Sequence, residues 1–172
     1  MGEFTAGLYG HSNPILKQVI LSTYENVGVN LGATTLQEAR LAETLCQRFH
    51  SIEKIRFCNS GTEANLYALS IARHVTGKRK VIAFRGGYHG GVFSFSNGVA
   101  KNNVDRDDWI LGTYNDVEGV KSLIRDSADV AAVIVEAMQG AGGCIPATLE
   151  FLKAVQESAK QACFLPIPAL SF

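Results

Sequence analysis

A run of small, hydroxylated and acidic residues, N-S-G-T-E-A-N at 59–65, has the composition of an anion-binding turn. It stands between an apolar run at 55–58 and a run with helical character at 66–75, so we expect a strand, a tight turn and a helix start. The first turn of a helix exposes backbone N–H groups, and these bind phosphate well. Ser60 and Glu63 also have the spacing of a capping box, which an ordinary helix start shows without any ligand.

Two glycine-rich segments follow two other apolar runs. R-G-G-Y-H-G-G at 85–91 comes after the run at 81–84, and M-Q-G-A-G-G at 138–143 comes after the β-branched run at 130–135. Short strands at these runs, and at 109–113, alternate with helices that we expect at 14–25, 35–49, 61–76, 116–124 and 149–161. This alternation predicts an α/β fold with a mostly parallel sheet and helices on both faces. The loops at 59–65, 85–91 and 136–143 should then converge beyond the carboxyl ends of the strands.

Composition excludes several classes of protein. The chain has 172 residues and a formal net charge of zero, so neither nucleic acid nor an anionic membrane surface is an expected partner. Its apolar runs fall well short of the roughly 18 residues that a membrane-spanning helix needs. The four cysteines have no metal-ligand spacing, so we expect no metal site. Free, buried thiols are typical of a reducing compartment, which favours the cytoplasm.

Several motifs, in this order, resemble the class-III aminotransferases, which are pyridoxal-phosphate enzymes of fold type I. They are G-L-Y-G-H-S-N-P (7–14), L-G-A-T-T-L-Q-E-A-R-L-A-E (31–43), R-F-C-N-S-G-T-E-A-N (56–65), T-G-K-R-K-V-I-A-F-R-G-G-Y-H-G (76–90) and V-E-A-M-Q-G-A-G-G (135–143). The branch that they resemble most contains glutamate-1-semialdehyde aminomutase and its aminotransferase relatives. The resemblance covers about residues 5–160 and implies a truncated form of the fold type I large domain.

The resemblance also implies roles for individual residues. The cofactor phosphate would be held by Ser60, Gly61 and Thr62, and Tyr88 would stack on the pyridine ring with His89 alongside. Glu136 and Gln139 would lie near the cofactor and substrate.

Simpler interpretations remain open for three of these residues. Tyr88 could be a surface residue, His89 a structural hydrogen-bonding group, and Glu136 a solvated carboxylate at a strand end. Ala137 stands where the family has proline, so the loop after Glu136 would be looser here.

Two catalytic groups of the family have no counterpart in the sequence. A carboxylate that pairs with the pyridine nitrogen would follow the helix that ends near Gln161, and a Schiff-base lysine would lie further on. The sequence instead reads A-C-F-L-P-I-P-A-L-S-F, with Pro166 and Pro168 in what should be a central strand. We therefore interpret residues 1–34 as a remnant of an N-terminal segment, 35–161 as part of the cofactor-binding large domain and 162–172 as an aberrant tail.

The sequence thus favours a fragment of a pyridoxal-phosphate-dependent transaminase, acting with a small amino donor and a carbonyl acceptor and homodimeric in its complete form. The fragment alone should be inactive, and its uncovered apolar faces should make it poorly soluble or partly unfolded. Three alternatives stay open: an aminomutase of the glutamate-1-semialdehyde type, a non-catalytic partner of a full-length homologue, and a phosphate-binding α/β domain unrelated to pyridoxal phosphate.

Overall fold

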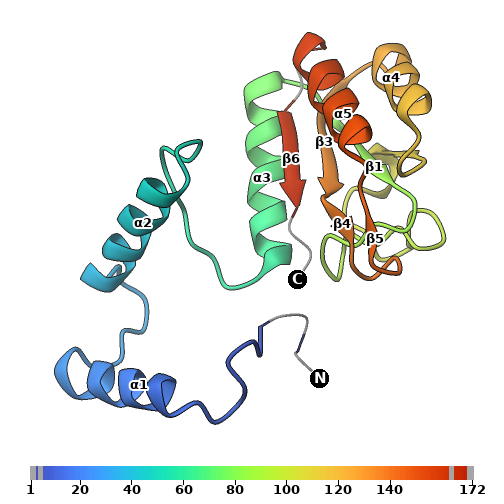
Figure 1. Ribbon diagram of the computed structural model, residues 1–172. Helices are drawn as coiled ribbons and strands as arrows, with labels where there is room; N and C mark the ends of the chain where they lie inside the picture. The colour runs from blue at the N-terminus through green and yellow to red at the C-terminus, as the bar shows by residue number, and fades with distance from the viewer. Residues whose placement is uncertain (1–2, 4–5, 163–164, 170–172) are drawn as a thin grey trace. The chain divides into compact units, whose positions relative to one another are not determined.

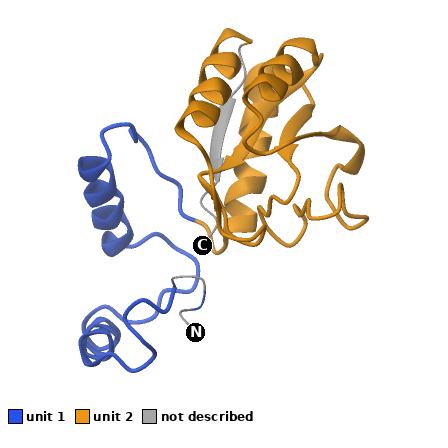
Figure 2. Ribbon diagram, turned by 45° about the vertical axis from the view of Figure 1, so that its right-hand side comes forward, with its two compact units in different colours: residues 1–57, 172 blue, residues 58–171 orange. Residues whose placement is uncertain are grey.

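The computed structural model describes residue 3, residues 6–162 and the strand at 165–169 (Figure 1). Two compact units divide the chain, one within residues 1–57 and the other within residues 58–171, and Figure 2 colours them separately. In the described part of the chain, no helix is both long and apolar enough to cross a membrane.

The first unit contains two helices, α1 (Pro14–Asn26) and α2 (Leu36–Arg48). Both begin at a side-chain cap: Asn13 accepts from the first amides of α1, and Thr35 Oγ1 accepts from the amide of Glu38 at 3.1 Å. The two predicted helices are therefore confirmed. Neither helix, as far as its described residues go, contains a buried side chain.

The second unit is built on a parallel sheet. Its strands are β1 (Lys80–Phe84), β2 (Trp109–Gly112), β3 (Val130–Glu136) and β6 (Leu165–Ala169), in the spatial order β2-β1-β3-β6. Every neighbouring pair is parallel. The helices are α3 (Gly61–Thr76), α4 (Val117–Asp126) and α5 (Leu149–Gln161), with a short 3-10 turn η2 (Arg106–Asp108) before β2. The predicted α/β alternation is thus confirmed.

Alternate side chains of β1 face opposite layers, as the period of two in a strand requires. Ile82 and Phe84 join the core beneath α4 and α5, whereas Val81 and Ala83 join a second core beneath α3. Every residue of β3 is buried, which explains the uninterrupted apolar run from Val130 to Val135. Helices therefore cover both faces of the sheet, as predicted.

The topology places a switch point between β1 and β3. The chain leaves β1 toward β2 on one side, whereas it leaves β3 through α5 toward β6 on the other. In open α/β sheets, ligands bind beyond the carboxyl ends of strands at such a point. The loops that begin at Arg85 and Ala137 follow these two strands, and Figure 1 shows α3 beginning at the same end of the sheet.

Some expectations were wrong in detail. Residues 55–58 form no strand, because they pair with no strand in the described residues. The second glycine-rich segment contains a small antiparallel pair, β4 (Met138–Gln139) and β5 (Ile145–Pro146). The thiols of Cys46, Cys58 and Cys144 are free, but two are half-buried and Cys144 is exposed; Cys163 lies outside the described residues.

The strand β6 pairs with β3 even though it contains two prolines, Pro166 and Pro168. Among the described strands β6 lies at the edge of the sheet, where proline is tolerated. Prolines two residues apart both lack an N–H group on the same side of the strand. Ile167 between them has its N–H group on the other side, where it can pair with β3. The proposed domain bounds, including the aberrant tail at 162–172, stay predictions, and residues 163–164 and 170–172 lie outside the described residues.

Candidate functional site

The first turn of α3 is capped by its own side chains. Ser60 is the N-cap, and its Oγ accepts from the amide of Glu63 at 3.1 Å. Glu63 reaches back, and its Oε2 accepts from the amide of Asn59 at 2.7 Å. This reciprocal arrangement is close to a capping box and fixes the direction in which the chain enters the helix.

The cap leaves part of the helix terminus available to a ligand. Within the described chain, the amides of Gly61 and Thr62 donate to no acceptor. The space where a side chain at Gly61 would lie is open. The hydroxyl of Ser60 accepts one hydrogen bond and keeps its proton to donate. Two free amides, a hydroxyl and the positive end of a helix dipole make a suitable phosphate site.

The loop at 85–91 is fastened to this helix start. The amide of Gly91 donates to Thr62 Oγ1 at 3.3 Å, and Asn65 Nδ2 donates to the carbonyl of His89 at 2.7 Å. A Cβ atom at Gly90 would lie 2.8 Å from Thr62 Cβ and 2.9 Å from Thr62 Cα. Gly90 also has a φ of 134°, which side chains rarely permit. Glycine is therefore required where the loop meets α3.

The same loop is fastened to the end of β3 by two buried side chains. Glu136 is only 2% exposed, and its Oε2 accepts from the amide of Tyr88 at 3.1 Å. Gln139 is 3% exposed, and its Nε2 donates to the carbonyl of Arg85 at 2.9 Å. The three loops thus converge, as the sequence predicted. Glu136 is not a solvated carboxylate, so that interpretation is wrong.

Burial changes the acidity of two neighbouring side chains. Loss of solvent lowers the pKa of His89 to about 4, so the imidazole is neutral near pH 7. Burial, with a smaller contribution from the charge of Glu136, raises the pKa of Tyr114 to about 12. The Tyr114 hydroxyl donates to the backbone carbonyl of Glu136 at 2.8 Å. The site therefore contains a neutral imidazole and a neutral phenol beside a buried carboxyl group.

Two buried polar atoms at this site, His89 Nδ1 and Glu136 Oε1, have no hydrogen-bond partner among the described residues. Unsatisfied buried groups are uncommon in proteins and are concentrated where a ligand or a further group binds. The ring of His89 instead packs against Phe95, with 6.0 Å between ring centres.

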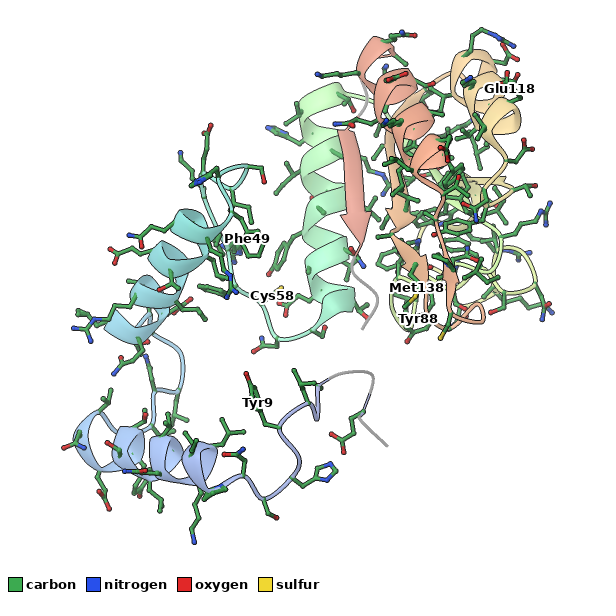
Figure 3. The ribbon with its side chains drawn as sticks, in the orientation of Figure 1. Tyr9, Phe49, Cys58, Tyr88, Glu118 and Met138 are labelled. Carbon is green, nitrogen blue, oxygen red and sulfur yellow. The ribbon has the colours of Figure 1, made fainter. Side chains whose placement is uncertain are left out.

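Tyr88 presents its ring at the surface, 43% exposed, while its backbone is held on both sides. Tyr88 forms an antiparallel β-bridge with Ser94, and the carbonyl of Gly87 accepts from the amide of Phe95 at 2.9 Å. Phe95 in turn packs on Trp109, with 4.9 Å between ring centres. Figure 3 shows Tyr88 and Met138 at the end of the sheet where β3 ends. An exposed aromatic face on a fixed backbone is suited to stacking on a planar ligand.

The family model described as Aminotransferase class-III matches residues 1–167 of this chain. The chain belongs to the class-III aminotransferase family. An uncharacterized aminotransferase of Schizosaccharomyces pombe is 55% identical over 156 residues, which cover 91% of this chain and 36% of that protein. The beta-phenylalanine transaminase of Variovorax paradoxus is 47% identical, covering 94% and 37%, and a glutamate-1-semialdehyde 2,1-aminomutase of Chlorobaculum parvum is 38% identical, covering 91% and 40%.

Solved structures of aminotransferases share the fold of this family member. The beta-phenylalanine aminotransferase from Variovorax paradoxus matches with a TM-score of 0.90 and 46% identity, over 96% of this chain and 38% of that one. A transaminase with PLP bound matches with a TM-score of 0.80 and 28% identity, over 92% and 40%. The aminotransferase resemblance and the fold type I large domain are thus confirmed. The chain spans about two-fifths of the length of the relatives it matches.

Sequence reasoning missed two residues of the site, Asn65 and Tyr114. Asn65 follows the capping box by two positions, and Tyr114 lies two residues beyond the end of β2. The position of Tyr114 just beyond a strand end was a usable signal, because polar residues there face the ligand edge of a parallel sheet. The cofactor-binding roles of Ser60, Gly61, Thr62, Tyr88 and His89 stay predictions.

Proposed function

We propose that residues 58–162 carry the phosphate and ring contacts of a pyridoxal-phosphate site and belong to a transaminase. The observation that supports this most is the pair of free amides at Gly61 and Thr62 beside the loop that presents Tyr88. A transaminase with PLP bound shares this fold, which supports the choice of cofactor.

The donors at the start of α3 and the exposed aromatic residue suit the phosphate and the ring of the cofactor. Gly61, Thr62 and the Ser60 hydroxyl would hold the phosphate, and the Tyr88 ring would cover one face of the pyridine ring. When bound, pyridoxal phosphate supplies an electron sink for amino-group transfer. His89 stays neutral and buried beside this ring, so it adds no charge to the site. We assign no catalytic residue in this chain, and we propose that the chain alone is inactive.

Binding of pyridoxal phosphate to the full 172-residue chain tests the proposal. Trp109 is the only tryptophan and lies in the core beneath the loop of Tyr88, so its fluorescence should be quenched by energy transfer to the bound cofactor. Inorganic phosphate should compete, whereas ATP and NAD should not quench in the same way. The G61P variant lacks the amide N–H of residue 61, so it should be quenched less than wild type. Equal quenching of the two proteins would refute the phosphate site. Proline is tolerated in the first helical turn, so α3 should still form in this variant.

Amino-group transfer is favoured over aminomutase chemistry. The two transaminase relatives are 55% and 47% identical to this chain, whereas the aminomutase is 38% identical. We further propose a small amino donor and carbonyl acceptor, a homodimer in the complete protein and a cytoplasmic location, with no metal, nucleic acid or membrane as partner. Turnover of an amino donor by the chain alone would contradict the proposed inactivity.

A further inference from the structure

We propose that Glu136 is a positioning residue, which sets the place of the Tyr88 ring through the Tyr88 backbone. This inference rests on the proposed cofactor site and gives Glu136 a different role from contact with the cofactor. Its carboxylate is 2% exposed and accepts from the Tyr88 amide at 3.1 Å. Tyr88 is 43% exposed, and the bond to its amide restrains the backbone from which its ring projects.

The backbone of Glu136 is itself held, so the carboxylate acts from a fixed point. Glu136 is the last residue of β3, and its carbonyl accepts from the Tyr114 hydroxyl at 2.8 Å. β3 is buried along its whole length and pairs with β1 and β6. Breaking a hydrogen bond to a buried acceptor on such a strand leaves the acceptor unsatisfied, so the bond restrains the amide that it binds.

Two glycines of the loop lie close to buried polar groups. A Cβ atom at Gly87 would lie 3.5 Å from Glu136 Oε2, 3.3 Å from His89 Nε2 and 2.9 Å from the Phe84 carbonyl. A Cβ atom at Gly86 would lie 3.0 Å from Gln139 Oε1. The glycines therefore let the backbone approach two buried polar side chains closely. The loop fits closely against these groups, in addition to the packing of its own His89 ring against Phe95.

The loop is also held from the opposite side. Thr62 and Asn65 of α3 bind its last residues, at the Gly91 amide and the His89 carbonyl. Gln139 binds its first residue at the Arg85 carbonyl. Glu136 acts between these points on the Tyr88 amide, while backbone hydrogen bonds with Phe93 and Phe95 hold the residues on either side of Tyr88. Loss of its acceptor should therefore loosen Tyr88 while the two ends of the loop stay in place.

Hydrogen exchange of the Tyr88 amide, measured by NMR without added ligand, tests this role. We compare wild type with E136L, which removes the acceptor at similar size, and E136Q, which keeps an acceptor oxygen on a side chain of the same length. E118Q is the matched control, because Glu118 is an exposed carboxylate on α4 that contacts only Lys121 at 2.7 Å in the described structure (Figure 3). The amides of β3 in the same spectra report general stability.

We expect exchange at Tyr88 to be roughly tenfold faster or more in E136L, with β3 unchanged, and within about threefold of wild type in E136Q and E118Q. Unchanged exchange in E136L overturns the proposal. Faster exchange across β3 as well, or equal loss in E136Q and E136L, also overturns it, because the effect would then be general or independent of an acceptor.

Titration with pyridoxal phosphate, followed by Trp109 fluorescence, then measures the consequence for the ring. E136L should weaken binding at least fivefold relative to E136Q. Equal binding by the two variants would refute a role in placing Tyr88. If wild type does not bind pyridoxal phosphate, the proposed cofactor site fails, whereas the exchange result still decides whether Glu136 holds the loop.

Discussion

Replacement of Gly90 by alanine tests the contact between the loop at 85–91 and the start of α3. Gly90 has a φ of 134°, which costs an L-residue on the order of 1–3 kcal/mol. The new Cβ would lie 2.9 Å from Thr62 Cα, a backbone atom that cannot rotate away. Such overpacking costs about 1–3 kcal/mol. If the loop moves away, the hydrogen bond from the Gly91 amide to Thr62 Oγ1 is lost, at about 1 kcal/mol.

These free-energy costs cannot simply be added, because a movement of the loop that relieves the clash also breaks the hydrogen bond. We therefore expect G90A to lower the free energy of unfolding of the sheet unit by about 3 kcal/mol. The matched control is G91A. Gly91 has open space around its Cβ position and no left-handed φ, and its amide remains in alanine.

Urea denaturation followed by Trp109 fluorescence measures both variants, since Trp109 lies in the core that α3 covers. G91A should remain within about 0.5 kcal/mol of wild type. G90A should also weaken pyridoxal phosphate binding at least tenfold, because Thr62 belongs to both the loop contact and the phosphate site. A G90A protein as stable as G91A would refute the close approach between Gly90 and Thr62.

Three further predictions concern the cap, the buried histidine and the first unit. S60A and T148A should each lower the free energy of unfolding by about 1 kcal/mol, because each removes the N-cap side chain of a helix. Only S60A should weaken phosphate binding in the fluorescence titration, and equal weakening in both variants would refute the phosphate site. Burial lowers the pKa of His89 to about 4. Below pH 6.5 the unfolded chain therefore takes up a proton at this residue while the folded chain does not. The free energy of unfolding should fall by up to about 3 kcal/mol as the pH drops from 6.5 to 4. Denaturation measured at several pH values should show no such loss of stability in H89L, whereas H74Q should show it, since His74 is exposed. A loss of stability in H89L equal to that of wild type would contradict the buried, neutral His89. The amides of α1 and α2 should exchange far faster than those of β1 and β3, because no described residue of either helix is buried, and equal protection by mass spectrometry would contradict this.

The helices and central strands were readable from the sequence because their signals are local. Thr35, Ser60 and Thr148 cap helices within three residues of the amides they bind, and the run at 130–135 is apolar throughout because both faces of β3 are covered. The run at 55–58 was also predicted as a strand, but it contains Arg56 and has no strand beside it in the described structure. Whether such a run becomes a strand depends on a partner that local sequence does not specify.

The site was predictable in its location and less so in its contacts. Strand ends in a parallel sheet meet at one edge, which brought Ser60, Tyr88 and Glu136 together in the prediction. The bond from the Tyr88 amide to Glu136 joins residues 48 positions apart, and the bond from Gln139 to the Arg85 carbonyl joins residues 54 apart. No spacing rule covers contacts of this kind. The sequence therefore placed Glu136 at the site and did not reveal that its carboxylate faces the loop backbone.

Glycine-rich loops are often interpreted as flexible, but the contacts of 85–91 support the opposite here. A Cβ atom would crowd Gln139 at Gly86, the Phe84 carbonyl at Gly87 and Thr62 at Gly90. Five side-chain hydrogen bonds, from Thr62, Asn65, Asn102, Glu136 and Gln139, hold the loop backbone. A loop ordered in this way loses little further entropy when a ligand binds. Because glycine has no side chain, groups from the sheet and from α3 can come close to the loop backbone. These contacts fix the loop and the backbone that carries the ring of Tyr88.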